Sequence, residues 1–258
     1  MAPFSNNVVA ITGAASRMGF EIAKLLVVQG AKLSLADIQA KALESAAAEL
    51  RELGGLDAVV MTTVVDVRVR EQVDSWIQKT VLELGGLHCA VNFAGVIDST
   101  MGASHLDGQE TDEGYNFVIE VNLRGVWNCL RAQLQHMKPG ASIVNASSAA
   151  GLIGFAGGAA YTASKHGVSG LTRCTAKEYG PKNIRVNAVA PGYILTPMTE
   201  IAVEVMGLSV GDMGPVKACA LGRPGSALEV AKLAVFLLSD DASYMTGTVI
   251  PIDGGLIC

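Results

Sequence analysis

Short apolar runs, rich in β-branched residues, alternate with longer stretches of helical periodicity along the chain. The apolar runs predict strands over 8–11, 32–36, 59–65, 88–91, 142–144, 185–189 and 248–252. The stretches between them predict helices over 18–29, 38–53, 70–84, 113–137, 160–179 and 227–238. Glycines follow the first three of these helices, at the position where helices commonly end.

The alternation of strands and helices indicates the fold class. Strands that are apolar throughout are typical of a parallel sheet with helices on both faces. No linker, low-complexity tract or internal repeat divides the sequence. We therefore expect residues 1–258 to form one doubly wound α/β domain around a mostly parallel, seven-stranded sheet.

Residues 139–164 carry no charged side chain, which raises the question of a membrane span. Glycine, serine and asparagine interrupt this window repeatedly, and a lipid-exposed helix rarely carries so many of them. We interpret the window as a buried strand followed by a glycine-rich loop. The first seven residues lack a basic segment before an apolar run, so no signal peptide is expected.

Composition narrows the classes of function. Half of the 258 residues are apolar, and 19 basic against 24 acidic residues give a net charge of −5. Clustered positive charge, which binders of nucleic acids or anionic membranes need, is missing from the sequence. Five scattered cysteines without CxxC or zinc spacing indicate reduced thiols in a cytoplasmic protein and no metal site.

The first predicted strand runs directly into the turn TGAASRMG, residues 12–19, which opens the first helix. A glycine turn at this place lets backbone N–H groups approach a pyrophosphate, and the helix N-terminus also favours an anion. About 20 residues further on, Asp37 ends the second strand, where a carboxylate accepts hydrogen bonds from adenosine ribose hydroxyls. The alternative is that Asp37 caps the next helix, and the two roles are compatible.

Tyr161 and Lys165 lie four residues apart and so on one face of a predicted helix. A phenol titrates near 10, and a neighbouring ammonium favours the phenolate, so we expect Lys165 to lower the pKa of Tyr161. The pair Ser147-Ser148 ends a predicted strand, and Ser148 precedes Tyr161 by thirteen residues. Since sites in open α/β sheets form at the carboxyl ends of strands, a serine hydroxyl there could hold a carbonyl oxygen beside the phenol.

These motifs resemble those of the short-chain dehydrogenase/reductase family, in order and over nearly the whole chain. The matching stretches are TGAASRMG, Asp66-Val67, NFAG at 92–95, VNLRG around Asn122, IVNASS, YTASK, IRVNAVAPG followed by Thr196, and TGTVIPIDGG. The resemblance implies a Rossmann fold and an NAD(P)-dependent oxidoreductase that interconverts a secondary alcohol and a ketone. A binding-only or non-redox member of the same fold is the alternative.

The resemblance also implies a catalytic tetrad of Asn122, Ser148, Tyr161 and Lys165. Ser148 would position the substrate oxygen, Tyr161 transfer the proton, Lys165 hold the nicotinamide ribose, and Asn122 order a water relay. Ordinary backbone hydrogen bonding is the competing interpretation for Asn92 and Asn122. The implied cofactor-binding residues are Gly13, Ser16, Arg17, Met18, Gly19, Asp37, Asp66, Val67, Asn92, Ala94, Gly95, Tyr161, Lys165, Pro191, Gly192, Ile194 and Thr196.

One position departs from the family pattern TGxxxGxG, because Arg17 replaces its middle glycine. Its side chain either crowds the adenosine, reaches a ribose or phosphate, or faces solvent. For cofactor choice we expect NAD(H) over NADP(H), since the Asp37 carboxylate repels a 2′-phosphate. Ile38 and Ser16 also stand where phosphate-accepting members tend to carry basic residues, whereas Arg17 would erode the preference.

Residues 193–221 are expected to form the substrate lid. This segment is rich in Met, Val, Leu and Gly, which favours an alicyclic, terpenoid or polyketide-like substrate of secondary metabolism, unless these residues pack on the body instead. By resemblance we also expect a homotetramer, with the 113–137 and 160–179 helices and the C-terminal strand at its interfaces. The apolar faces of those helices are equally compatible with a core within one chain.

Overall fold

The structure, a computed structural model, describes residues 3–97, 106, 111–195 and 214–258. Seven strands form one sheet in the order β3-β2-β1-β4-β5-β6-β7, and all six neighbouring pairs are parallel. This confirms the expected doubly wound fold, with a sheet that is parallel throughout. The strands are β1 Val8–Thr12, β2 Lys32–Asp37, β3 Val60–Val64, β4 Cys89–Asn92, β5 Ser142–Ala146, β6 Arg185–Pro191 and β7 Val249–Ile252.

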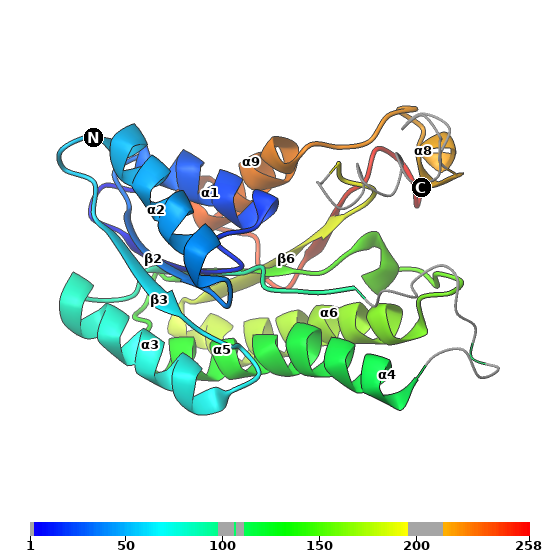
Figure 1. Ribbon diagram of the computed structural model, residues 1–258, viewed down its shortest axis with the longest axis horizontal. Coiled ribbons are helices and arrows are strands. Elements are labelled where there is room, and N and C mark those ends of the chain that lie inside the picture. The colour runs from blue at the N-terminus through cyan, green and yellow to red at the C-terminus, as the bar shows by residue number, and fades with distance from the viewer. Residues whose placement is uncertain (1–2, 98–105, 107–110, 196–213) are drawn as a thin grey trace.

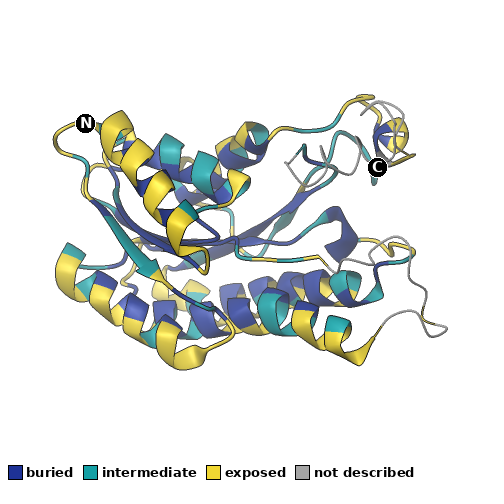
Figure 2. Cartoon of the chain, viewed as in Figure 1, coloured by how far each residue is buried: buried dark blue, intermediate teal, exposed yellow. Residues whose placement is uncertain are grey.

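Helices cover both faces of the sheet (Figure 1). One face carries α1, α2 and α9, and the other carries α3, α5 and α6. Their outward sides are exposed, whereas the strands between them are mostly buried (Figure 2). The helices are α1 Arg17–Val27, α2 Ala40–Gly54, α3 Arg70–Leu84, α4 Asp112–Ile119, α5 Gly125–Leu134, α6 Ala159–Tyr179, α8 Gly214–Ala218 and α9 Ala227–Leu238.

Local sequence explains where several helices begin and end. Gly85 adopts a left-handed conformation at the end of α3, and Ser226 and Glu229 form a reciprocal capping box at the start of α9. These two helices have the predicted bounds. Helix α2 starts two residues later than expected, because the Asp37 carboxylate accepts the N–H of Gln39 and holds that residue outside the helix.

The continuous helix predicted over 113–137 is wrong in two respects. A π-helical turn, Glu120–Arg124, separates α4 from α5, and α5 already ends at Leu134. A π-helical turn widens the helix by one residue and occurs frequently at functional sites. The uncharged window 139–164 contains β5, a 3₁₀ turn Ala149–Gly151, a loop and the start of α6, as its strand-and-loop interpretation requires.

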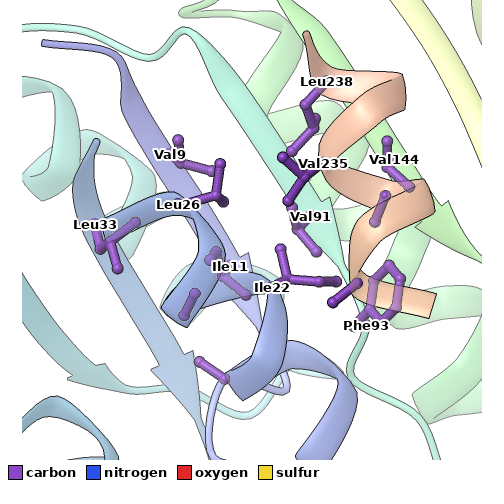
Figure 3. Close-up of a cluster of buried hydrophobic side chains, with 14 of the residues drawn as sticks. Val9, Ile11, Ile22, Leu26, Leu33, Val91, Phe93, Val144, Val235 and Leu238 are labelled. Carbon is purple, nitrogen blue, oxygen red and sulfur yellow. The ribbon is translucent and has the colours of Figure 1, made fainter. Parts of the chain in front are cut away.

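The face under α1 and α9 holds the larger apolar core (Figure 3). Alternate residues of β1, Val9 and Ile11, point to this face and meet Ile22 and Leu26 of α1. Val235 and Leu238 of α9 close the same cluster.

The opposite face mixes apolar and polar side chains. Ser34 of β2 accepts a hydrogen bond from the Trp76 indole (2.9 Å) and lies 2.6 Å from the Thr80 hydroxyl, both on α3. Further amide and hydroxyl groups lie buried under α5 and α6. Among the described residues, no helix has both the length and the apolar character needed to cross a membrane.

Candidate active site

The predicted site residues gather at one edge of the sheet, where the parallel strands end. Strand β1 ends before Gly13, β2 ends at Asp37, β4 ends at Asn92 and β5 ends just before Ser147. Crevices at this edge are the usual ligand sites of open α/β sheets. Among the described residues, no group of three His, Cys, Asp or Glu side chains could hold a metal ion.

The turn after β1 is pressed against the loop after β4. Gly13 has a φ of +67°, and a Cβ there would lie 2.8 Å from the backbone of Phe93 and Ala94. The Thr12 hydroxyl accepts the N–H groups of the same two residues, at 3.1 and 3.2 Å. A Cβ at Gly19 would collide with the Gly13 carbonyl. Both glycines are therefore required by the space available in this turn.

Ser16 and Arg17 lie at the start of α1, and both are exposed. The Ser16 hydroxyl donates to the Gly13 carbonyl (2.6 Å) and makes no capping bond to the helix. First-turn N–H groups of a helix have no partner within the helix itself, so this N-terminus suits an anion. Met18, half-buried, packs against the apolar core.

Asp37 is buried and bridges two backbone segments. Its Oδ2 accepts the N–H of Ala15 (3.1 Å), and its Oδ1 accepts the N–H of Gln39 (3.0 Å). A carboxylate offers about four lone-pair positions, so two acceptor positions remain for ribose hydroxyls. The structural and the cofactor-binding interpretations of Asp37 are thus compatible.

Asp66 has a partner that the sequence did not suggest. Arg68 Nη2 lies 2.6 Å from Asp66 Oδ2, and its hydrogen bond is the main cause of a lowered Asp66 pKa. The same guanidinium lies 5.6 Å from the centre of the Phe117 ring. Val67 is buried against Gly125, where a Cβ would lie 2.6 Å from a Val67 methyl group.

Asn92 takes part in a buried side-chain network. It donates to Asn145 Oδ1 (2.9 Å) and exchanges hydrogen bonds with Gln133 of α5 (3.1 and 2.8 Å). Asn145 donates in turn to the Thr172 hydroxyl of α6 (3.0 Å). The Asn92 side chain therefore joins β4 to neighbouring elements through side chains rather than through the backbone bonds considered from the sequence.

Asn122 lies in the π-helical turn and is fully buried. Its amide makes a reciprocal pair with the Val96 backbone, accepting at 2.8 Å and donating at 2.9 Å, and donates to Ser164 Oγ at 3.2 Å. A Cβ at Gly95 would lie 3.3 Å from Asn122 Oδ1 and 3.5 Å from Lys165 Nζ. The absence of a side chain at Gly95 thus leaves room for both groups.

Ser148, Tyr161 and Lys165 are brought together by β5 and α6. The Ser148 and Tyr161 side chains form a hydrogen bond. Lys165 Nζ donates to the Ala146 carbonyl (2.9 Å) and lies 5.5 Å from the centre of the Tyr161 ring. A phenol, a hydroxyl and an amine therefore meet at the end of β5.

The expected lowering of the Tyr161 pKa by Lys165 is wrong for this structure. Burial raises the pKa of Tyr161, and the hydrogen bond from Ser148 offsets only part of that rise. Burial also lowers the pKa of Lys165 to about 8. Loss of hydration disfavours the charged form of each group, so a neutral, proton-bearing phenol is favoured near pH 7.

The end of β6 closes the site on its other side. Gly192 donates to the Ile252 carbonyl (3.1 Å), and a Cβ at Gly192 would lie 2.7 Å from Asp253 Cα. Pro191 and Ile194 are buried, and Ile194 forms an isolated bridge with Gly225. Residues 196–213, which include Thr196 and most of the lid expected at 193–221, lie outside the described residues.

Comparisons with known proteins show which family the chain belongs to. A family described as enoyl-(acyl carrier protein) reductase matches residues 13–257. The short-chain dehydrogenase/reductase aba4 of Botryotinia fuckeliana is 48% identical over 260 residues, covering 99% of this chain and 98% of that protein. The chain belongs to the short-chain dehydrogenase/reductase family.

Two further relatives of this short-chain dehydrogenase/reductase carry names that indicate a reaction. Levodione reductase of Leifsonia aquatica is 40% identical over 98% of this chain and 94% of its own length. Cyclohexanol dehydrogenase of an Acinetobacter species is 38% identical over 97% of this chain and 95% of its own length. A crystal structure of levodione reductase superposes with a TM-score of 0.88 at 38% identity, covering 98% of both chains. The family chemistry is alcohol–ketone redox with NAD(H) or NADP(H).

Several polar residues at the site were missed from the sequence. They are hydroxyl, amide and guanidinium side chains that were given no role of their own, namely Arg68, Gln133, Asn145, Ser164, Ser169 and Thr172. A pattern that could have revealed some of them exists in α6. Lys165, Ser169 and Thr172 recur at helical spacing on its buried side, which is unusual for polar residues.

Proposed function

We propose that this protein interconverts a secondary alcohol and a ketone, with Tyr161 as the proton-transfer group. The observation that carries the proposal is the meeting of Ser148, Tyr161 and Lys165 at the end of β5. In the reducing direction, Ser148 orients the ketone oxygen and the Tyr161 phenol donates its proton to it. The nicotinamide, when bound, supplies the hydride that the carbonyl carbon receives.

Lys165 and Asn122 support this proton transfer in the proposed mechanism. The raised Tyr161 pKa keeps the phenol protonated before the step, which suits a proton donor. Lys165 has a pKa of about 8, and its Nζ lies 5.5 Å from the centre of the Tyr161 ring. It is proposed to stabilise the phenolate that the step forms and to hold the nicotinamide ribose. Asn122 is proposed to order a water relay that returns a proton towards Lys165.

The proposed cofactor site runs along the same edge of the sheet. The pyrophosphate would lie at the Gly13–Gly19 turn, the adenosine ribose at Asp37, and the adenine near Asp66 and Val67. Asn92, Ala94 and Gly95 would line the floor, and residues 191–196 would hold the carboxamide. The positive φ of Gly13 and its backbone contact with Phe93 and Ala94 fit such a cradle.

NAD(H) is the proposed preferred cofactor. The Asp37 carboxylate is buried and is fixed by hydrogen bonds from Ala15 and Gln39. Beside the proposed ribose position it would repel a 2′-phosphate. Arg17 is exposed at the first position of α1, from which its guanidinium would have to fold back to compensate. NADP(H) is therefore the weaker cofactor in this proposal.

The proposed substrate is a largely apolar, alicyclic, terpenoid or polyketide-like metabolite of secondary metabolism. The loop between Ser148 and Tyr161 has no charged residue, and it exposes Ile153 and Phe155 close in sequence to both catalytic groups. A hydrogen bond from Gly158 to the Phe155 carbonyl holds this loop in a turn. The relatives named for levodione and cyclohexanol support a cyclic ketone or alcohol.

Absorbance at 340 nm tests the proposed function directly. Cyclohexanol with NAD⁺, and cyclohexanone with NADH, are the first substrates of a panel of cyclic alcohols and ketones. We expect cofactor-dependent turnover with members of this panel and none with sugar phosphates or coenzyme-A thioesters. Tight NADH binding without turnover of any alcohol or ketone would favour the binding-only alternative.

A homotetramer is the proposed assembly. Trp127 of α5 and Tyr115 and Phe117 of α4 are large exposed side chains. Ile119, Leu123 and Trp127 line a groove together with Gly167 and Leu171 of α6. A second copy of the same helices would cover this surface. Sedimentation at micromolar concentration should give the tetramer mass, and a monomer would refute the proposal.

We also propose a single domain with a substrate lid at about 193–221 and a cytoplasmic location. The seven strands share one sheet, which favours a single domain. The described residues include all five cysteines, and none of them forms a disulfide, which favours a reducing compartment.

A further inference from the structure

Two buried serines that the proposed tetrad does not include lie directly behind it. Ser147 follows the last residue of β5 and is 3% exposed, and Ser169 of α6 is 1% exposed. Their Oγ atoms are 2.8 Å apart. Buried hydroxyl groups are normally hydrogen-bonded, so the partners of this pair indicate its role.

The pair holds the backbone of α6 at the position of Lys165. Ser147 Oγ lies 3.2 Å and Ser169 Oγ 3.1 Å from the Lys165 carbonyl oxygen, and Ser169 also donates to the Gly151 carbonyl (3.2 Å). The two hydroxyl protons are thus shared among three acceptors, namely the Lys165 carbonyl, the Gly151 carbonyl and one of the two Oγ atoms. Removal of either hydroxyl leaves one of these buried acceptors without a donor from the pair.

Lys165 is consequently held at both of its ends by consecutive residues of one segment. The Ala146 carbonyl accepts from Lys165 Nζ, and the Ser147 hydroxyl bonds to the Lys165 carbonyl. The next residue, Ser148, is the hydrogen-bond partner of Tyr161. Three successive residues therefore determine where the amine, the helix backbone and the phenol lie relative to one another.

The space around the pair allows little adjustment. A Cβ at Gly151 would collide with Ser147 Oγ and would lie 2.7 Å from the Lys165 carbonyl oxygen. The 3₁₀ turn Ala149–Gly151, which Ser148 begins, is therefore packed closely against both the serine pair and α6. Small displacements of the pair would be transmitted to Ser148 and Lys165 together.

We propose that Ser147, assisted by Ser169, is a positioning residue that sets the placement of Lys165 against Tyr161 and Ser148. The proposal rests on the alcohol–ketone function proposed above. Neither serine touches the reacting atoms in this assignment. Their effect on the reaction passes through the Lys165 backbone and the turn that carries Ser148.

The test compares Ser147→Ala with Ser34→Ala as a matched control. Ser34 is also a fully buried serine, whose Oγ lies 2.6 Å from the Thr80 hydroxyl, but its partners Trp76 and Thr80 belong to α3. Both variants remove one buried hydroxyl from a hydroxyl pair. We expect each to lower the Tm by a few degrees, about as much as the other.

Only Ser147→Ala should change the reaction. With cyclohexanol and NAD⁺ we expect kcat to fall about 10- to 100-fold, the order found for slightly misplaced catalytic groups. The pH profile of kcat should also shift, because the Lys165 amine then lies at a different position beside Tyr161. NADH affinity, measured by fluorescence, should fall about fivefold through Lys165, and Ser34→Ala should match the wild type in all three measurements.

Equal kcat, pH profile and NADH affinity in Ser147→Ala and Ser34→Ala would overturn the proposal. Should Ser147→Ala not fold, Ser169→Ala removes the other half of the pair and is expected to show the same changes to a smaller extent. A wild type that binds NADH but oxidises no alcohol would instead contradict the proposed function. In that event NADH affinity in the variants still tests the positioning of Lys165.

Discussion

On the face of the sheet that α1, α2 and α9 cover, the buried side chains are mostly apolar, whereas hydroxyl and amide groups interrupt the core on the face under α3, α5 and α6. Ile11, Ile22 and Leu26 typify the first face. Asn92 and Asn145 typify the second, where every polar group described above has a hydrogen-bond partner.

The difference separates two tasks within one sheet. Apolar burial has no preferred direction, so the first face can hold α1 and its glycine turn in place without specifying a reaction. Directional hydrogen bonds specify angles as well as distances, and the second face uses them around Lys165. We infer that damage to the first face lowers stability, and that damage to the second face lowers turnover.

The largest effect is expected for Lys165→Ala on the polar face. Turnover should fall by about 10³-fold, within the range of lost acid–base catalysis, and cofactor affinity should fall with it. Lys165→Met serves as the matched control, because it keeps most of the side-chain volume without the amine. Steady-state kinetics and NADH titration check both variants. A Lys165→Met enzyme with near wild-type turnover would remove the amine from the mechanism.

Leu26→Ala on the apolar face should lower stability and leave turnover nearly unchanged. Leu26 is fully buried between α1 and the sheet, so its truncation should lower the free energy of unfolding by about 2–5 kcal/mol. Denaturant titration measures this change. Turnover of the folded enzyme should stay within about twofold of the wild type. A large loss of kcat in the folded variant would contradict the division between the two faces.

Asp37→Ala should change cofactor choice at the edge that both faces share. Removal of the carboxylate should shift the ratio of kcat/KM for NAD⁺ over NADP⁺ towards NADP⁺ by about 10- to 100-fold, because a repulsion is lost. Asp37→Asn separates charge from hydrogen bonding, since it keeps one acceptor for Ala15 or Gln39 without the charge. Arg17→Gly should move the ratio in the opposite direction. A wild-type preference for NADP⁺ would contradict the proposed role of Asp37.

The smallest effect concerns pH and the start of β4. The His88 Nδ1 atom accepts the N–H of Val8 (3.0 Å), and burial lowers the pKa of His88. The unfolded chain therefore takes up this proton first as pH falls, and stability declines below about pH 6.5, towards the folded-state pKa. The Tm should fall by on the order of 1 °C from this group. His88→Gln should remove the part of the decline in Tm that comes from His88. A variant whose Tm depends on pH as in the wild type would refute this role of His88.

The periodicity of apolar residues predicted the fold well, because apolar burial determines where most strands and helices lie. The bounds of α3 and α9 follow directly from apolar spacing, glycine and a capping box. Nothing in the sequence pattern indicated the π-helical turn at Asn122, since such a turn depends on packing around one inserted residue. The partners of Asn92 could not be predicted either, because Gln133 and Asn145 are distant in sequence and meet only across the folded sheet.

Tyr161→Phe, with turnover and NADH affinity measured on the same preparation, tests the central assignment most directly. The change removes one oxygen atom and the bond to Ser148, and it leaves the ring and Lys165 in place. We predict a loss of turnover of at least about 10³-fold in either direction, with NADH affinity within about twofold of the wild type. A Tyr161→Phe enzyme that keeps most of its activity would contradict the account.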